Sequence, residues 1–254
     1  MRFLGKHVYS EQFKRSLAIV KKNIRIYYSK GPVITFGLLI PFFLFLSFYI
    51  GRSSSVEDLI PGLLAITVFF TASSVGPAIV PWEARSKTLE RLVSCPVSIW
   101  TIFVGDMLSS FLFGAIISVF PVIIGLLLGV EIASPLLLGL GITAGALCFA
   151  ALGVLMSAYP PTDVPATIMM LSSMIKFPLV FISGIFIPIQ ELPDWGRIVS
   201  SFSPLTYFTD LGRSSIQGYS YYPYWLDIVV VVAFAIVFLV SAVKLHERTI
   251  QKRL

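Results

Sequence analysis

Long stretches with few or no charged side chains recur along this sequence, and they constrain its fold more than any other feature. A helix that crosses the hydrocarbon core of a membrane needs about 20 predominantly apolar residues. Six stretches have about this length, at residues 31–51, 59–82, 99–130, 132–158, 164–187 and 226–244. The composition agrees, because 56% of the residues are hydrophobic and 13% are charged, against roughly 25% charged in soluble domains. We therefore predict an all-α polytopic membrane protein, with residues 1–254 forming a single transmembrane domain of six spans.

The positively charged residues are distributed unevenly between the segments that flank these spans. If the chain starts on the cytoplasmic side, 15 of the 19 Lys and Arg residues lie in cytoplasmic segments. Only Arg52, Arg197 and Arg213 lie in external loops, and Lys176 lies within a span. Cytoplasmic loops of membrane proteins carry such an excess of Lys and Arg. We therefore expect a multi-pass protein of the cell membrane with both termini in the cytoplasm, and we assign the net charge of +6 to orientation rather than to nucleic acid binding.

Residues 8–28, which precede the first span, have the pattern of a basic amphipathic helix. Apolar side chains recur at spacings of three and four, at Phe13, Leu17, Val20, Ile24 and Tyr27. The opposite face carries Lys14, Arg15, Lys21, Lys22 and Arg25. Such a helix is suited to lying in the interface between the bilayer and water. A solvated helix that leads into the first span is the alternative.

A charged segment with the sequence EARSKTLERLVSCPVS, residues 83–98, separates the second and third spans. Leu89, Leu92 and Val93 have helical i, i+3, i+4 spacing, so the apolar and charged side chains fall on separate faces. Pro96 ends this helical pattern. The distribution of Lys and Arg places the segment in the cytoplasm, and we predict a short amphipathic helix there.

Residues 188–225 form the largest predicted external segment, between the fifth and sixth spans. The first part of this segment is too apolar for a free loop, and Pro193 and Pro204 make it too broken to span twice. We expect a re-entrant helical hairpin, because backbone at membrane depth must be helical, buried in protein or in contact with water. An ordinary loop packed on the bundle is the alternative.

Small and ionisable residues predict which spans lie inside the bundle. Glycine and alanine recur along residues 132–158, and small residues let membrane helices approach closely. Asp106 and Lys176 lie within spans, where a charge usually faces the bundle interior or water. Their predicted depths are close enough for the long lysine side chain to reach the carboxyl group. We hypothesise an Asp106–Lys176 ion pair or a shared water-filled cavity, and the alternative is that Asp106 caps a helix near the interface.

Two stretches of the sequence resemble the permease subunits of type-2 ABC exporters, a family of drug, polysaccharide and lipid efflux permeases. Residues 83–98 are similar to the family segment E-x-R-x-x-G-T-L-E-R-L-x-x-x-P-V/I. Residues 177–213, FPLVFISGIFIPIQELPDWGRIVSSFSPLTYFTDLGR, are similar to F-x-S-G-x-F-x-P-x-x-x-L-P-x-W followed by N/S-P-L-T-Y and a downstream arginine. Lys87 departs from the pattern, because the family usually has glycine before Thr-Leu-Glu.

The resemblance implies that residues 83–98 form a coupling helix, which contacts a separate ABC ATPase subunit. The residues at this contact would be Glu83, Arg85, Lys87, Thr88, Leu89, Glu90 and Arg91. The resemblance also implies that the N-terminal amphipathic helix touches the ATPase and that an external hairpin caps the pathway. The hairpin residues would be Gly184, Pro188, Leu192, Pro193, Trp195, Pro204 and Tyr207. The functional unit would be a permease homodimer with two ATPase copies, with the substrate path between the permeases.

The chain lacks the motifs of an enzyme or of a subunit that carries its own energy source. There is no G-x-x-x-x-G-K-[ST] phosphate loop, so we expect no cofactor in this chain and expect ATP and Mg²⁺ to bind to the partner ATPase. Cys95 and Cys148 lack metal-ligand spacing, so no metal site is expected. A membrane-embedded enzyme has little support, since H-E-x-x-H and G-x-S-x-G are also absent.

We therefore predict the membrane-spanning permease of an ATP-driven ABC exporter, which moves its substrate by alternating rearrangement of a permease dimer. The spans offer mostly Leu, Ile, Val and Phe with scattered Ser, Thr and Tyr, which fits an amphipathic or lipid-like substrate. A proton-coupled secondary carrier that uses Asp106 is the alternative. That carrier would lack a second acid or histidine beside Asp106 and the internal repeat that carriers show.

Overall fold

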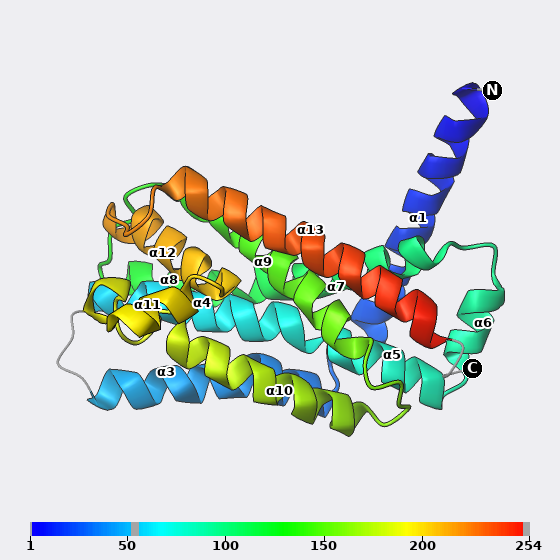
Figure 1. The fold of residues 1–254 in the computed structure, drawn as a ribbon, viewed down its shortest axis with the longest axis horizontal. Helices are drawn as coiled ribbons and strands as arrows, with labels where there is room; N and C mark the ends of the chain where they lie inside the picture. The colour runs from blue at the N-terminus through cyan, green and yellow to red at the C-terminus, as the bar shows by residue number, and fades with distance from the viewer. Residues whose placement is uncertain (1, 52–55, 251–254) are drawn as a thin grey trace.

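The protein is a bundle of helices, and a computed structural model describes residues 2–51 and 56–250 of it (Figure 1). Within these residues the structure contains no β-strand. Most of the long helices run along the longest axis of the molecule, whereas α1 projects from one end of the bundle (Figure 1). Arg52, Lys252 and Arg253, which entered the count of positive charges, lie outside the described part of the chain.

The helices follow one another along the chain with short connections. The first half contains α1 (Arg2–Tyr27), α2 (Gly31–Ile34), the π-helical turn η1 (Thr35–Leu39), α3 (Ile40–Gly51), α4 (Val56–Ser74), α5 (Gly76–Arg85), α6 (Thr88–Ser94) and α7 (Ile99–Ile117). The second half contains α8 (Val119–Leu127), α9 (Pro135–Ser157), α10 (Pro165–Ile182), the 3-10 turn η2 (Ile189–Glu191), α11 (Asp194–Ser200), α12 (Pro204–Gln217) and α13 (Tyr224–Thr249).

Five helical stretches in the described residues are long and apolar enough to cross a membrane. They are Glu57–Arg85, Ile99–Leu127, Pro135–Ser157, Pro165–Ile182 and Tyr224–Thr249. Each of them overlaps one of the six predicted spans. The remaining predicted span, residues 31–51, is helical along its length but contains η1, and it is not among the five.

Prolines mark the places where the long helices are interrupted. Proline has no amide proton to donate to the preceding turn of a helix. The α4–α5 stretch breaks at Val75, shortly before Pro77, and the α7–α8 stretch breaks at Ser118, shortly before Pro121. The π-helical turn η1 likewise ends shortly before Pro41. Each interruption leaves backbone carbonyls without a helical partner, and in a membrane other protein groups must satisfy them.

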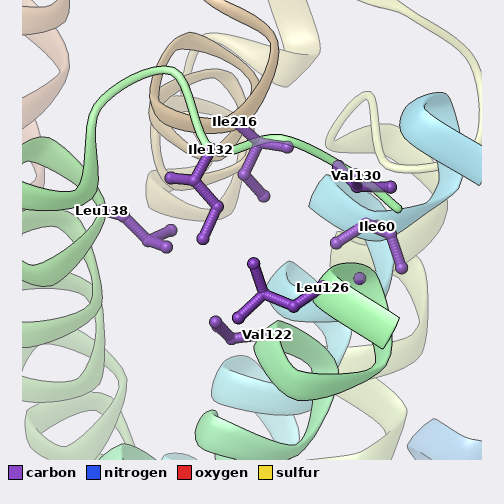
Figure 2. Close-up of a pocket in the computed structure, with 8 residues that line it drawn as sticks. Ile60, Val122, Leu126, Val130, Ile132, Leu138 and Ile216 are labelled. Atoms are coloured by element: carbon purple, nitrogen blue, oxygen red, sulfur yellow. The ribbon is translucent and has the colours of Figure 1, made fainter. Parts of the chain in front are cut away.

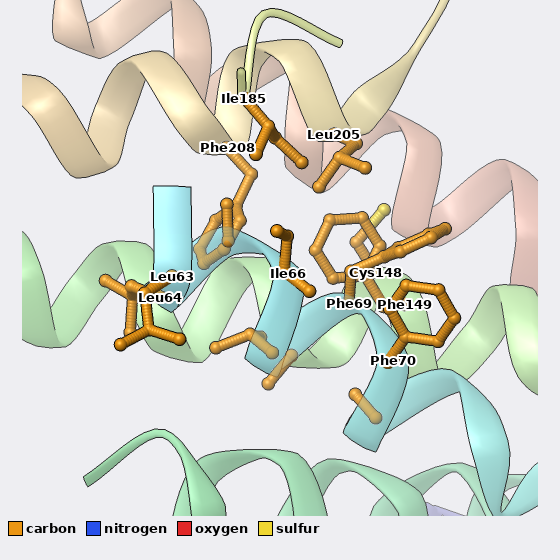
Figure 3. Packing of buried hydrophobic residues seen from close by; sticks show 14 of the residues in the cluster. Leu63, Leu64, Ile66, Phe69, Phe70, Cys148, Phe149, Ile185, Leu205 and Phe208 are labelled. Carbon is orange, nitrogen blue, oxygen red and sulfur yellow. The ribbon is translucent and has the colours of Figure 1, made fainter. Parts of the chain in front are cut away.

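Helix α4 is buried in the bundle, and aromatic rings join it to α9 and α12 (Figure 3). Phe69 of α4 packs edge-to-face on Phe149 of α9, with ring centroids 5.0 Å apart. Phe149 packs in the same way on Phe208 of α12, at 5.4 Å. Edge-to-face geometry is a favoured arrangement of aromatic pairs. The three rings therefore tie α4 to α9 and α12.

Small residues let α9 approach the backbone of α5 directly. The buried residues of α9 include Ala150, Ala151 and Gly153, which agrees with the prediction that this span lies inside the bundle. A Cβ atom added at Gly76 of α5 would lie 2.6 Å from the carbonyl carbon of Gly153. The two helices are thus in backbone contact at the break in the α4–α5 stretch.

A small cavity lies where α4, α8, α9 and α12 converge (Figure 2). Aliphatic side chains line it, among them Ile60, Val122, Leu138 and Ile216. Its described lining residues carry no polar side chain, so the cavity offers no side-chain hydrogen bond to a ligand. We interpret it as an imperfection in packing where four helix ends meet.

We expect Gly76→Ala to destabilise the bundle, because the added methyl group would collide with the backbone of α9 rather than with a movable side chain. The expected loss in the free energy of unfolding is about 1–3 kcal/mol, as for other overpacked cores. The melting temperature of the detergent-solubilised protein measures it. Gly139→Ala on α9 is the matched control, because nothing lies within 4 Å of a Cβ atom added there. Equal melting temperatures for the two variants would contradict the backbone contact.

Candidate functional site

Helix α6 lies at the end of the bundle where both described chain ends are found, and it joins α5 to α7 (Figure 1). A tight turn at Ser86 and Lys87 precedes it. The amide and the hydroxyl group of Ser86 both donate to the carbonyl of Trp82, the hydroxyl at 2.6 Å. Lys87 has φ 56° and ψ 21°, and it is the only non-glycine residue in the described chain with a positive φ.

The conformation of Lys87 explains why the family motif carries glycine at this position. A left-handed backbone brings Cβ too close to the following carbonyl oxygen, and glycine avoids this cost because it has no Cβ. The lysine found here keeps the same turn at a conformational cost. Its side chain is exposed, so it adds positive charge to the surface beside α6.

The structure corrects the prediction of one continuous helix at residues 83–98. Glu83 and Arg85 belong to the last turn of α5, and α6 ends at Ser94, before Pro96. The turn at Lys87 separates the two helices, and a periodic pattern of apolar residues does not reveal such a turn. Side chains that we predicted to share one helix therefore lie on two.

Five of the seven residues predicted to contact an ATPase are exposed: Arg85, Lys87, Thr88, Glu90 and Arg91. The other two are buried, Glu83 at 2% exposure and Leu89 at 1%. Leu89 packs in an apolar cluster with Val80 of α5 and Phe103 of α7, so it anchors α6 on the bundle. Glu83 and Leu89 therefore face the interior of this chain, and their predicted contact with an ATPase stays a prediction.

Glu83 forms an ion pair with Lys22 of α1. The guanidinium group of Arg15, also on α1, donates to the carbonyl of Pro96, in the connection that follows α6. The remaining basic residues predicted for the interface helix are exposed: Lys14, Lys21 and Arg25. The interface helix is thus bonded to the segments on both sides of α6, and two of its five basic side chains serve this internal contact.

A line of polar contacts fixes α1 against α7. Asn23 Nδ2 donates to Asp106 Oδ1 at 2.7 Å and to Ser109 Oγ at 3.1 Å. About two turns closer to the chain start, the Ser16 hydroxyl donates to the carbonyl of Thr101 at 3.1 Å. All of these residues are buried. This polar seam, residues 16–23 of α1 against residues 101–109 of α7, holds α1 on the bundle.

Helix α1 consequently has a buried face, an exposed apolar face and an exposed basic face, whereas the sequence predicted one apolar and one basic face. Val20 and Tyr27, from the predicted apolar face, are buried in the bundle. The other three members of that face are exposed: Phe13, Leu17 and Ile24. Burial, and then the carboxylate of Glu83, raises the pKa of Tyr27, so its hydroxyl group keeps its proton beside that carboxylate.

Asp106 and Lys176 are both buried, but they do not pair. Lys176 Nζ donates to the carbonyl oxygen of Ser73 at 2.9 Å, whereas the Asp106 carboxylate accepts from Asn23. Helix α7 packs mainly on α1, α4 and α9, whereas α10 packs mainly on α5. The predicted Asp106–Lys176 ion pair is therefore wrong, because the two spans direct these side chains to different neighbours.

The predicted hairpin region consists of η2, α11 and α12. Gly184 has φ 72°, which lets the chain turn after α10, and its carbonyl accepts a hydrogen bond from Arg213 Nη2 at 2.6 Å. Pro204 begins α12, and the hydroxyl group of Tyr207 donates to the carbonyl of Ser201 at 2.9 Å. These bonds connect the end of α10, α11 and α12 into one unit.

Helix α11 has an exposed apolar face. Trp195 is 69% exposed and Ile198 63%, and Phe202, which follows the end of the helix, is 77% exposed. A proline fixes the backbone just before each of the two short elements. Pro188 precedes η2 and Pro193 precedes α11, and Leu192 lies between the end of η2 and Pro193. An apolar face of this kind is typical of a helix that lies against lipid or another apolar surface.

Sequence reasoning missed the role of Asp210, which joins α12 to the connection that leads into α13. Its two carboxylate oxygens accept the amide protons of Tyr221 at 2.9 Å and Tyr222 at 2.7 Å. Burial raises the pKa of Asp210, and these two hydrogen bonds oppose that effect. The sequence does not reveal these two hydrogen bonds, because their partners are backbone amides 11 and 12 residues away and no periodic pattern of side chains marks them.

Residues 14–216 match the family model described as ABC-2 type transporter. The match begins within α1, includes α6 and extends to the end region of α12. No curated protein matches the chain. Among the described residues, no three or more His, Cys, Asp or Glu side chains are grouped so that they could hold a metal ion.

We expect Lys87→Gly to raise the free energy of unfolding by up to about 1 kcal/mol. The relief of the left-handed conformation, about 1–2 kcal/mol, exceeds the larger entropy loss of glycine, about 0.5–1 kcal/mol. Arg85→Gly, two residues earlier in helical backbone, is the control and should lower the stability. Denaturation of both variants in the same detergent is the measurement, and a loss of stability in Lys87→Gly would contradict the left-handed turn.

Lys22→Met should destabilise the protein by about 3 kcal/mol, because it leaves the buried carboxylate of Glu83 without its cation. The double variant Lys22→Met/Glu83→Gln should regain most of this loss, since it leaves no unpaired charge at position 83. Lys21→Met, at the exposed neighbouring position, is the control and should have little effect. The melting temperatures of the three variants are the measurement. A double variant as unstable as Lys22→Met would show that the loss of stability in Lys22→Met does not come from breaking the ion pair.

Proposed function

Since the chain belongs to the ABC-2 type transporter family, we propose that it is the membrane-spanning permease of an exporter that separate ATPase subunits drive. As an ABC-2 membrane permease it has no ATPase activity. In the proposed complex, ATP and Mg²⁺ bind to two ATPase subunits, and two copies of this chain enclose the substrate path. The cargo is amphipathic or lipid-like, in keeping with the apolar spans.

The observation that carries this proposal is the exposed surface of α6 and its attachment to two spans. Lys87, Glu90 and Arg91 are exposed at the end of the bundle, whereas Leu89 holds the helix on the core. Short connections join α6 to α5 on one side and to α7 on the other. A displacement of α6 would therefore be transmitted to both the α4–α5 and the α7–α8 stretch through short connections rather than through a flexible linker. Charges of both signs on this surface would set the register of a partner.

Helix α1 supplies the second part of the proposed contact. Lys14, Lys21 and Arg25 are exposed, and the Lys22–Glu83 ion pair and the bond from Arg15 to Pro96 join α1 to the segments beside α6. We propose that α1 lies at the cytoplasmic membrane interface, with its exposed apolar residues in lipid, and that it moves together with α6.

The proposed topology has six spans with both termini in the cytoplasm. The α2–η1–α3 stretch, residues 31–51, is the sixth span in addition to the five long apolar ones. The segment from η2 to α12 lies at the end of the bundle opposite α6 (Figure 1), where we propose that it forms the external re-entrant hairpin. The exposed apolar face of α11 supports this placement.

The location of Asp106 argues against the alternative of a proton-coupled carrier. Its carboxylate lies in the contact between α1 and α7, where Asn23 binds it. A relay residue needs a route for protons on both sides, but this group is 1% exposed and joins two helices near one end of the bundle.

Reversal of the two adjacent charges on α6, Glu90→Arg/Arg91→Glu, should reduce the amount of ATPase that co-purifies with the permease by about tenfold or more, as for mismatched charges in an interface. The control is Glu247→Arg/Arg248→Glu, which reverses a similar exposed pair on α13. Co-purification and ATP hydrolysis by the complex are measured for both. If the α6 reversal leaves both quantities at the wild-type level, α6 is not the coupling contact.

A further inference from the structure

Pro77 leaves one carbonyl of the α4–α5 stretch without a helical partner. In a continuous helix, the amide of residue 77 would donate to the carbonyl of residue 73. Proline has no amide proton, so the Ser73 carbonyl loses this bond, and the helix breaks at Val75. Ser73 is completely buried, so water does not reach this carbonyl. We call residues 73–77 the bend.

The amine of Lys176 takes the place of the missing amide. Its Nζ donates to the Ser73 carbonyl at 2.9 Å, from α10, which packs on α5. The lysine is 2% exposed, and its Nζ also lies 6.0 Å from the centroid of the Phe70 ring, one turn before the bend. An ionisable residue inside a membrane bundle is costly, and such residues commonly bind backbone carbonyls at functional places. Lys176 thus makes one bond, and that bond is to the carbonyl that Pro77 frees.

Neighbouring helices approach the bend closely, and α9 does so with its backbone. A Cβ atom at Gly76 would collide with the backbone of Gly153 on α9, and one at Gly37 in η1 would lie 2.7 Å from the hydroxyl oxygen of Ser74. The π-helical turn of one stretch therefore lies against the bend of the next. The bend is enclosed by η1, α9 and α10, and beyond it α5 leads directly to the turn before α6.

We propose that Lys176 is a positioning residue, which sets the geometry of the bend and thereby the transmission of movement from α6 into the membrane-embedded part of this span. The proposal rests on the proposed function, because it assigns the source of movement to α6. The bond from Lys176 replaces one helical hydrogen bond with one from another helix. The angle between α4 and α5 is therefore coupled to the position of α10.

A double-mutant cycle tests whether Lys176 and Pro77 act on the same carbonyl. Lys176→Met removes the amine with little change of volume, and Pro77→Ala returns an amide proton at residue 77. Each single variant should melt several degrees below the wild type, since the first leaves Ser73 without a partner and the second leaves the buried amine without one. The double variant should melt near the wild type. Additive losses would show that Lys176 does not act through the Ser73 carbonyl.

The ATP hydrolysis rate of the permease–ATPase complex in nanodiscs separates positioning from simple stabilisation. The double variant, although stable, should hydrolyse ATP several-fold more slowly than the wild type, because its stretch is a continuous helix without the bend. A double variant that is both stable and fully active would overturn the proposed role. Ser172→Ala on α10 is the control, because the hydroxyl group of this buried serine bonds only within its own helix.

The melting temperatures and the ATP hydrolysis rates test two separate claims. The melting temperatures are measured on the permease alone, so they test the Lys176 bond whether or not an ATPase binds. A wild-type permease that binds no ATPase would contradict the proposed function and leave the result of the cycle standing.

Discussion

A backbone group inside a membrane must find its hydrogen-bond partner within the protein, because lipid offers none. This constraint decides where the bundle bends and which polar side chains its interior tolerates. Where the helices are regular, buried hydroxyl groups bond carbonyls of their own turn, as Thr71 does with Thr67 and Ser157 with Val154. Where Pro77 interrupts a helix, a side chain from another helix is required, and Lys176 meets this need.

The buried charged and amide groups mostly join helices that are distant in the sequence. Asn23 with Asp106 and Lys22 with Glu83 connect α1 to the ends of two membrane stretches. Arg213 with Gly184 connects α12 to the end of α10. A polar bond in a low-dielectric interior is directional and costly to leave unmade, so these pairs fix the relative placement of helices that apolar packing alone would allow to slide.

The helical architecture could be predicted from the sequence because apolar length is a local property. The stretches around α4–α5, α7–α8, α9, α10 and α13 were found to within a few residues, and so was the short helix α6 between the second and third of the predicted spans. The partners of buried polar groups could not be predicted. Periodicity shows which side of a helix is apolar, but it does not show that Glu83 is covered by α1 or that Lys176 points to α5 rather than to Asp106. The turn at Lys87 could not be predicted for a related reason. Glycine at this position would have indicated a left-handed backbone, whereas lysine does not.

The polar seam between α1 and α7 has a consequence for the order of events during synthesis. Asn23 and its partner Asp106 are separated by 83 residues. At roughly 5–20 residues per second, the ribosome needs roughly 4–17 s to extend the chain from one to the other. During this interval the amide of Asn23 lacks this carboxylate, and Lys22 lacks its own partner until Glu83 is made, 61 residues later in the chain. Both side chains depend on water for solvation until their partners are made. Helix α1 therefore docks on α7 only after the third predicted span has been made.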